Sequence, residues 1–371
     1  MIEEIRKALS TVIDPELHRS ITELEMVESI EVDGGAVRLK VLLTIAGCPM
    51  KDRLQNDITN AVRAVEGVRS LDLTFGAMTQ EQRDKVKVLM RNGRERQISF
   101  AQPDSLTRVI AVASGKGGVG KSSVTANLAT AAARKGFKVG ILDGDVYGHS
   151  IPRLMGIVGQ RPTAIDQSFI PITAHGVKVV SMEMFKPERD DAVAYRGPLL
   201  HRVLEQLLAD AMWGDLDFLF LDLPPGTGDL AISLGQMVPN SEIIVVTTPQ
   251  LAAAEVAERA GRIGHAMHQQ ILGVIENMSG VTCAQCGEVT HLFGEGGGEE
   301  TARKLSTLVG ADVPLLGKVP FTASLREGGD NGAPLAISDP ENAAAKALNE
   351  IIEKVVKRSK SLVGVRLGLA T

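Results

Sequence analysis

One segment of the chain has the residue types and spacing of a phosphate-binding loop. Residues 115–122 read G-K-G-G-V-G-K-S and lie between a short apolar run and an Ala-rich segment. Glycines let backbone N–H groups approach phosphate oxygens without a Cβ clash, and the N-terminus of a following helix adds the positive end of its dipole. Because G-x-x-x-x-G-K-[ST] occurs here in the strand–loop–helix order that the motif requires, we predict a nucleotide site.

Two side chains of this loop predict how phosphates and a metal ion are held. Lys121 supplies a point charge to the outer phosphates, and the hydroxyl of Ser122 is a ligand for Mg²⁺. The nucleotide-binding residues predicted from the loop are Gly115, Lys116, Gly117, Gly118, Val119, Gly120, Lys121, Ser122 and Ser123.

Polar side chains follow several other short apolar runs. Asp143 and Asp145 end one such run, Asp222 ends another and Asn277 ends a third. Ligands of parallel α/β sheets bind beyond the carboxyl ends of the strands, so we expect these side chains to converge on the phosphate loop. A purely structural capping role remains the alternative for Asp143 and for Asn277.

A second chemical group is the pair Cys283 and Cys286. A C-x-x-C turn directs two thiolates toward one metal, whereas a structural zinc site or a [4Fe–4S] cluster takes four ligands. A two-fold dimer interface brings identical patches face to face, so two pairs complete a set of four. We therefore expect a cluster that bridges two chains; zinc with His291, or a redox-active dithiol, are the alternatives. Cys48 is left open between a reactive thiol, a transient cluster ligand and a small buried side chain.

The elements that must position these residues divide into two compositional regimes. Residues 1–80 predict a small α+β domain with the order α-β-β-α-β, and residues 81–106 a charged linker. Residues 107–371 predict an α/β domain whose mostly parallel sheet carries helices on both faces, because its strands are continuously apolar. The strands are expected at 109–114, 138–143, 177–182, 217–222, 242–248, 271–277 and 313–320.

Composition argues against several classes of protein. The 371 residues carry 40 Lys+Arg and 45 Asp+Glu, a net charge of −5, with 3 cysteines and few aromatic residues. This balance gives no general attraction to nucleic acid, and three cysteines cannot form a disulfide framework. With no apolar run of about 20 residues and no signal-like start, we expect a cytoplasmic protein with no membrane or nucleic-acid partner.

Lys116 makes the loop more specific. The sequence G-K-G-G-V-G-K-S resembles the deviant Walker A motif of a class of dimeric ATPases that includes nitrogenase iron protein, MinD and the Mrp/ApbC carriers. The resemblance implies that Lys116 reaches the partner's nucleotide and that Asp145 positions the attacking water, so Lys116, Lys121 and Asp145 are the expected catalytic residues. It also implies that Asp222 holds Mg²⁺ through water beside a phosphate-sensing switch, PPGTGD. Asn277 would read adenine, and the loop after Pro320 would cover the base.

The ordered motifs of residues 106–355 resemble those of the Mrp/ApbC iron–sulfur cluster carriers. They are SGKGGVGKSS, DGDVYGHSIP, LDLPPGTGD, ENMSG with the C-x-x-C, and FGEGGGEETA. The N-terminal part, with IDPE and TIAGCPM, resembles the small domain associated with Fe–S assembly. The resemblance implies a P-loop ATPase that binds ATP, Mg²⁺ and a labile [4Fe–4S] cluster at a homodimer interface and delivers the cluster to apo-proteins. The second, stable cluster of longer eukaryotic scaffolds is not expected, because no N-terminal four-cysteine site is present.

Two other functions fit parts of the pattern. A MinD-like membrane-positioning ATPase needs a basic amphipathic C-terminal helix. The end of this chain offers Lys354, Lys357, Arg358 and Lys360 beside Ile351, Ile352, Val355 and Val356. We expect that helix instead to close the α/β fold. An electron-donating reductase like nitrogenase iron protein is the other alternative, but its cysteines lie at separated positions.

Overall fold

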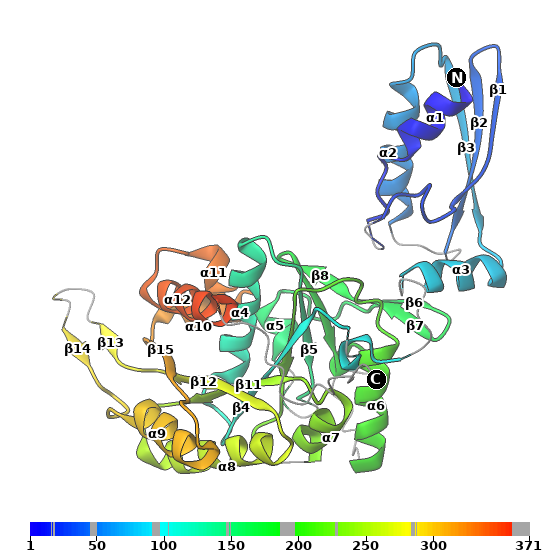
Figure 1. The fold of residues 1–371 in the computed structure, drawn as a ribbon. Coiled ribbons are helices and arrows are strands. Elements are labelled where there is room, and N and C mark those ends of the chain that lie inside the picture. The colour runs from blue at the N-terminus through cyan, green and yellow to red at the C-terminus, as the bar shows by residue number, and fades with distance from the viewer. Residues whose placement is uncertain are drawn as a thin grey trace. The chain divides into compact units, whose positions relative to one another are not determined.

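The computed structural model divides the chain into two compact units (Figure 1). One unit comprises Met1–Gln97 with Thr163–Ile170, and the other comprises Ile98–Pro162 with Pro171–Thr371. The structure describes residues 1–15, 17, 19–44, 50–90, 97–102, 104–145, 148, 150–185, 197–226, 229–282, 286 and 288–357.

The first unit is built on a three-stranded sheet of order β1-β2-β3. Strand β1 is antiparallel to β2, and β3 is parallel to β2, which confirms the predicted order of helices and strands. The elements are α1 (Ile2–Leu9), β1 (Val27–Asp33), β2 (Ala36–Leu43), α2 (Lys51–Arg63), β3 (Ser70–Ala77) and α3 (Gln80–Met90). Ile5 and Ile58 are fully buried between helices and sheet. Ile2, the first residue of α1, is 44% exposed.

Helix α3 and a short hairpin from later in the chain complete this unit. The hairpin pairs β6 (Thr163–Ile165) with β7 (Ser168–Ile170). Asp166 at its turn accepts a hydrogen bond from Gln80 Nε2 at 2.8 Å and pairs with Arg83 Nε at 3.4 Å. The domain limits 1–80 and 107–371 remain a prediction from the sequence.

The second unit contains an eight-stranded sheet whose strand order is β15-β12-β11-β4-β10-β5-β9-β8. Seven strands are parallel and β8 is antiparallel at the edge. Its strands are β4 (Arg108–Ser114), β5 (Val139–Asp143), β8 (Ile172–Ala174), β9 (Val177–Ser181), β10 (Phe218–Asp222), β11 (Glu242–Thr247), β12 (Gln270–Asn277) and β15 (Leu315–Val319). All seven predicted strands are confirmed, as is the α/β class; β8 was not predicted.

Helices cover both faces of this sheet (Figure 1). One face carries α4 (Lys121–Arg134), α5 (Ile151–Leu154), α10 (Ala323–Asp330), α11 (Leu335–Ser338) and α12 (Ala343–Lys357). The other carries α6 (Gly197–Ala209), α7 (Asp229–Met237), α8 (Leu251–Ala266) and α9 (Gly297–Val309). The remaining elements are the 3₁₀ turns η1 (Ser99–Ala101) and η2 (Met182–Phe185) and the strands β13 (Val281–Thr282) and β14 (Val289–Thr290).

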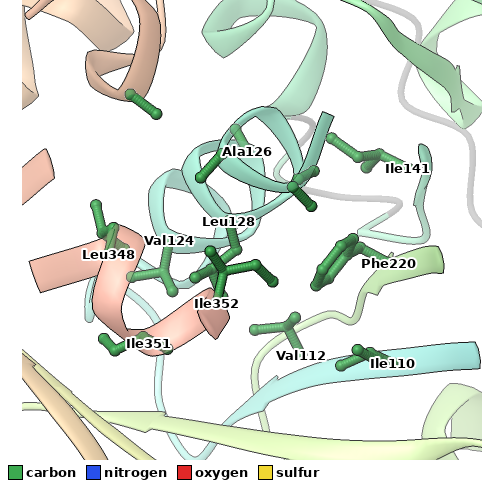
Figure 2. Close-up of a cluster of buried hydrophobic side chains, with 14 of the residues drawn as sticks. Ile110, Val112, Val124, Ala126, Leu128, Ile141, Phe220, Leu348, Ile351 and Ile352 are labelled. Atoms are coloured by element: carbon green, nitrogen blue, oxygen red, sulfur yellow. The ribbon is translucent and has the colours of Figure 1, made fainter. Parts of the chain in front are cut away.

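The apolar face of α12 is part of the core of this unit. Figure 2 shows Leu348 and Ile351 of α12 beside Val124 and Leu128 of α4, above Ile110 of the sheet. In the basic amphipathic segment expected at the C-terminus, the apolar residues Ile351, Ile352 and Val355 are therefore buried in the core of this unit. Among the helices that the structure describes, none combines the length and apolar character of a membrane span.

Candidate functional site

The polar residues predicted to converge do lie at one edge of the parallel sheet. Asp222 pairs in register with Asp143 on one side and with Val112 of β4 on the other. Strand β4 then leads through Ser114 into the phosphate loop. The strand order β12-β11-β4-β10-β5 thus brings the ends of five strands to the same edge.

The loop needs glycine at two positions. Gly118 and Gly120 both have φ of +79°, a left-handed conformation that side chains rarely adopt. Gly120 is also the N-cap of α4, and a Cβ there would collide with the side-chain amide of Asn277. The loop therefore turns tightly into α4 while it lies against the end of β12.

Beneath the loop, three side chains of α4 converge on one carboxylate. Lys121 Nζ lies 2.6 Å from Asp222 Oδ1, and Ser122 Oγ donates to Asp222 Oδ2 at 2.6 Å. Thr125 Oγ1 donates to Asp222 Oδ1 at 2.9 Å. Thr125 is not among the predicted site residues, although its position one helical turn after Lys121 places it on the same face of the helix. Lys121 and Asp222 are both buried, so their opposite charges compensate each other away from water.

Asp143 lies on the other side of Asp222. Burial, reinforced by the neighbouring charge of Asp222, raises the pKa of Asp143 well above its ordinary value, against the opposing effect of Lys121. Its carboxylate accepts hydrogen bonds from Ser181 Oγ at 3.0 Å and from the backbone N–H of Asp145 at 3.1 Å. Asp143 therefore fixes the turn that presents Asp145 to the cavity described next.

A cavity of about 650 Å³ opens above the loop, within the size range of small-molecule sites. Of the predicted residues, Lys116 to Ser123, Asp145 and Asn277 line it, while Gly115 does not and Asp222 is buried below. Pro320 itself does not line it, so its role in nucleotide binding stays a prediction, whereas the loop that follows Pro320 does reach the cavity. Strand β15 ends at Val319, and the backbone N–H of Phe321 bonds to Gly280 O at 2.8 Å, so Phe321 and Thr322 face the cavity instead.

Asn277 contacts the loop directly. Its Nδ2 donates to Val119 O at 2.9 Å, while its buried Oδ1 has no hydrogen-bond partner among the described residues. A buried acceptor without a partner carries a desolvation cost, which a ligand donor can offset. Asn277 thus combines a place in the wall of the cavity with a side-chain oxygen that has no partner among the described residues.

Lys116 points to another strand end of the same chain. Its Nζ donates to Gln250 Oε1 at 2.8 Å. Gln250 is the N-cap residue of α8, just after β11. Gln250 is not among the predicted site residues, because its contact with Lys116 joins residues 134 positions apart and no local motif marks it.

The cysteine segment, residues 278–298, begins immediately after Asn277 and leads into α9. Within it, strands β13 and β14 precede and follow the C-x-x-C, pair antiparallel and project from the body of the unit (Figure 1). Cys286 is exposed as a free thiol; Cys283 lies outside the described residues, as do Cys48 and Thr227 and Gly228 of the switch motif. His291, the alternative zinc ligand, pairs with Glu295 at 2.7 Å. No group of three or more metal-binding side chains occurs in the part of the chain that the structure describes.

Family models match both parts of the chain. Residues 105–356 match the NUBPL iron-transfer P-loop NTPases, and residues 2–73 match an iron–sulfur cluster assembly protein. An iron–sulfur cluster carrier protein of Mycobacterium bovis is 53% identical over 367 residues, which cover 98% of this chain and 96% of that protein. The chain belongs to the iron–sulfur cluster carrier family. A carrier protein of Deinococcus radiodurans is 41% identical over 354 residues, 95% of this chain and 93% of its own length.

A solved structure supports the same assignment for the NTPase part of this carrier-family member. The nucleotide-binding protein of Archaeoglobus fulgidus in complex with ADP is 34% identical, with a TM-score of 0.54 over 66% of this chain and 95% of that chain. The predicted family, the P-loop fold and the ATPase class are confirmed. The match of the N-terminal part favours the carrier family over the MinD-like alternative, which rested on the NTPase part alone.

Proposed function

We propose that this carrier-family member binds ATP in the cavity above the phosphate loop and carries a labile [4Fe–4S] cluster between two chains. One observation supports this reading most: β12 ends at Asn277 in the wall of the cavity, and the chain runs from there directly into the cysteine segment. The nucleotide site and the candidate cluster site therefore share one stretch of backbone.

The loop residues would bind and polarise the triphosphate. Lys121 would exchange its pairing with Asp222 for contacts with the outer phosphates, while Asp145 orients the attacking water at the rim of the cavity. The hydroxyl of Ser122 and the carboxylate of Asp222 are hard oxygen donors within 2.6 Å of each other, a set that suits Mg²⁺. When bound, Mg²⁺ would neutralise charge on the phosphate oxygens.

Asn277 would select adenine. Its Oδ1 is a buried acceptor with no partner in the described structure, and the exocyclic amino group of adenine is a donor that could satisfy it. Phe321 and Leu325 offer apolar surface in the same cavity for the base. A capping role alone would leave that oxygen without a partner.

Two chains would complete the cluster site. Each chain offers Cys283 and Cys286, and a [4Fe–4S] cluster takes four thiolates, so a homodimer supplies the full set. Lys116 would leave Gln250 on dimerisation and reach the nucleotide of the partner, as a finger residue does in trans. The cluster is cargo for apo-proteins, and thiolate ligands favour a reducing compartment such as the cytoplasm.

Anaerobic reconstitution tests this function. With iron and sulfide counted and visible absorption recorded, occupancy should approach one [4Fe–4S] per two chains and rise with the dimer population. Cys283→Ala and Cys286→Ala should each lose the cluster but keep ATP binding, whereas Cys48→Ala should keep the cluster. One cluster per monomer, or a colourless protein with one tightly held zinc per chain, would contradict the bridging site.

A further inference from the structure

Both ends of the cysteine segment are held by one buried carboxylate. Glu276 is 1% exposed and immediately precedes Asn277. Its Oε1 accepts a hydrogen bond from Ser279 Oγ at 2.5 Å, where the chain leaves β12. Its Oε2 accepts from the backbone N–H of Gly298 at 2.7 Å, where the chain returns in the first turn of α9. The cysteine segment, which carries Cys283 and Cys286, is thus hydrogen-bonded to Glu276 at both of its ends.

The glycine-rich sequence before α9 makes this closure possible. A Cβ on Gly298 would lie 2.8 Å from Glu276 Cβ and 2.9 Å from Leu315 Cδ1. A Cβ on Gly297 would collide with the backbone carbonyls of Thr248 and Pro249 at the end of β11. The first turn of α9 can therefore reach the carboxylate only because these residues lack side chains.

The same stretch of chain forms a wall of the nucleotide cavity. Asn277, the next residue, donates to Val119 O of the phosphate loop. Ser279 N donates to Val319 O at 3.0 Å, and Phe321 N donates to Gly280 O at 2.8 Å. Asn277 and Phe321 both line the cavity, so a nucleotide that moves either residue also displaces residues 278–280.

The charge of Glu276 is only partly balanced. Lys318 Nζ lies 3.8 Å from Glu276 Oε1 but 2.6 Å from Glu299 Oε1, with which it makes its closer ion pair. The two hydrogen bonds from the ends of the cysteine segment are therefore shorter than the contact of this buried carboxylate with Lys318. A carboxylate held in this way is sensitive to the position of either donor.

We infer that Glu276 is a positioning residue that couples nucleotide binding in the cavity to the conformation of the cysteine segment. Glu276 does not line the cavity and belongs to neither cysteine turn; it acts through Asn277 on one side and through Ser279 and Gly298 on the other. The inference builds on the proposed roles of the cavity and of the cysteine pair.

The test measures cysteine reactivity in the full-length, cluster-free chain. Alkylation of Cys283 and Cys286 by iodoacetamide is followed by peptide mass spectrometry under anaerobic conditions, with Mg-ATP, with a non-hydrolysable ATP analogue and without nucleotide. Cys48 serves as the internal reference, since it precedes every nucleotide-site residue by more than sixty positions in the chain. In the wild type the rate with nucleotide should differ from the rate without it by about fivefold or more, the lower range of known couplings.

Glu276→Gln should bring that ratio close to one while nucleotide still binds. The amide keeps the volume of the side chain but removes its charge and offers one acceptor oxygen in place of the two that accept from Ser279 and Gly298. Ser279→Ala removes only the other contact and should reduce the ratio in part, which keeps the inference testable if Glu276→Gln does not fold. Glu300→Gln is the matched control: it changes another carboxylate in the first turn of α9, whose ion pairs are with Arg303 and Lys304, and its ratio should stay at the wild-type value.

Two results would overturn the inference. One is a wild-type ratio of one with nucleotide demonstrably bound. The other is an unchanged ratio in Glu276→Gln, including the case in which both rates change by the same factor, as a merely structural role would produce. Because the readout needs no cluster, a chain that fails to assemble [4Fe–4S] but shows the expected ratios would refute the proposed cargo and leave the coupling intact.

Discussion

At the scale of single residues, the site is organised by Asp222. It accepts from Ser122 and Thr125 and pairs with Lys121, all on the first turns of α4. A buried carboxylate with this many donors is fully compensated without a ligand, so the loop is held ready before nucleotide arrives. Binding then substitutes phosphate for one of these partners.

Lys121→Ala should reduce ATP hydrolysis by about 10²–10³-fold, because the outer phosphates lose their fixed cation. Nucleotide binding should weaken sharply, which titration with a fluorescent ATP analogue would show. Lys135→Ala, at the exposed end of the same helix where it pairs with Glu353, is the control and should hydrolyse ATP normally. Unchanged hydrolysis by a folded Lys121→Ala protein would remove the loop from the mechanism.

Lys116→Ala should keep ATP affinity within a few-fold but lose turnover by on the order of 10³-fold, as when a finger residue is removed. Mixing it with Lys121→Ala should restore part of the activity. In the mixed dimer, the intact Lys116 of one chain faces the intact Lys121 site of the other. Gln250→Ala, which removes only the partner of Lys116 in the single chain, should retain turnover. No recovery on mixing would indicate that Lys116 acts within its own chain.

At the scale of elements, helices are positioned by apolar faces and by a few polar ends. Helix α12 buries Leu348, Ile351 and Ile352 against α4 and β15 (Figure 2). Helix α9 is held at its N-terminus by Glu276. The first contact stabilises the sheet that carries the loop, and the second ties the cysteine segment to it.

Leu348→Ala should lower the free energy of unfolding by about 2–5 kcal/mol, because it leaves a cavity in the core between α12 and α4. Urea unfolding followed by circular dichroism measures the change. Glu350→Ala, exposed on the same helix, should change it by less than about 0.5 kcal/mol. A stable Leu348→Ala protein that sediments with anionic vesicles would instead favour the membrane-positioning alternative.

At the scale of the whole molecule, two units serve two purposes. Every residue that lines the nucleotide cavity lies at or after Ser114, while the first unit includes residues 1–97 and the hairpin 163–170. The hairpin contributes Asp166, which pairs with Arg83 of α3. The first unit thus contains the hairpin 163–170, although the residues before and after this hairpin in the sequence belong to the second unit.

A chain that starts at Ile98 should fold and hydrolyse ATP at a rate close to that of the full protein, since it keeps the whole nucleotide site. Its melting temperature should fall, because Asp166 of the hairpin loses its partners on α3 and the buried residues Ile165 and Phe169 lose the rest of their unit. Circular dichroism and a phosphate-release assay check both points. A folded but inactive truncation would show that the first unit takes part in the ATPase site.

The sequence by itself determined the features that depend on contiguous residues. The phosphate loop, the seven apolar strands and the small α-β-β-α-β unit follow from spacing along the chain, because glycine, β-branched and helical patterns act over a few residues. The family could be recognised for the same reason. The tertiary structure decided what joins distant segments: Thr125 on Asp222, Lys116 on Gln250, and Phe321 at the wall of the cavity. It also decided that Glu276 closes the cysteine segment on Gly298. These contacts depend on which strands become neighbours and where each one ends, and local sequence does not encode that order.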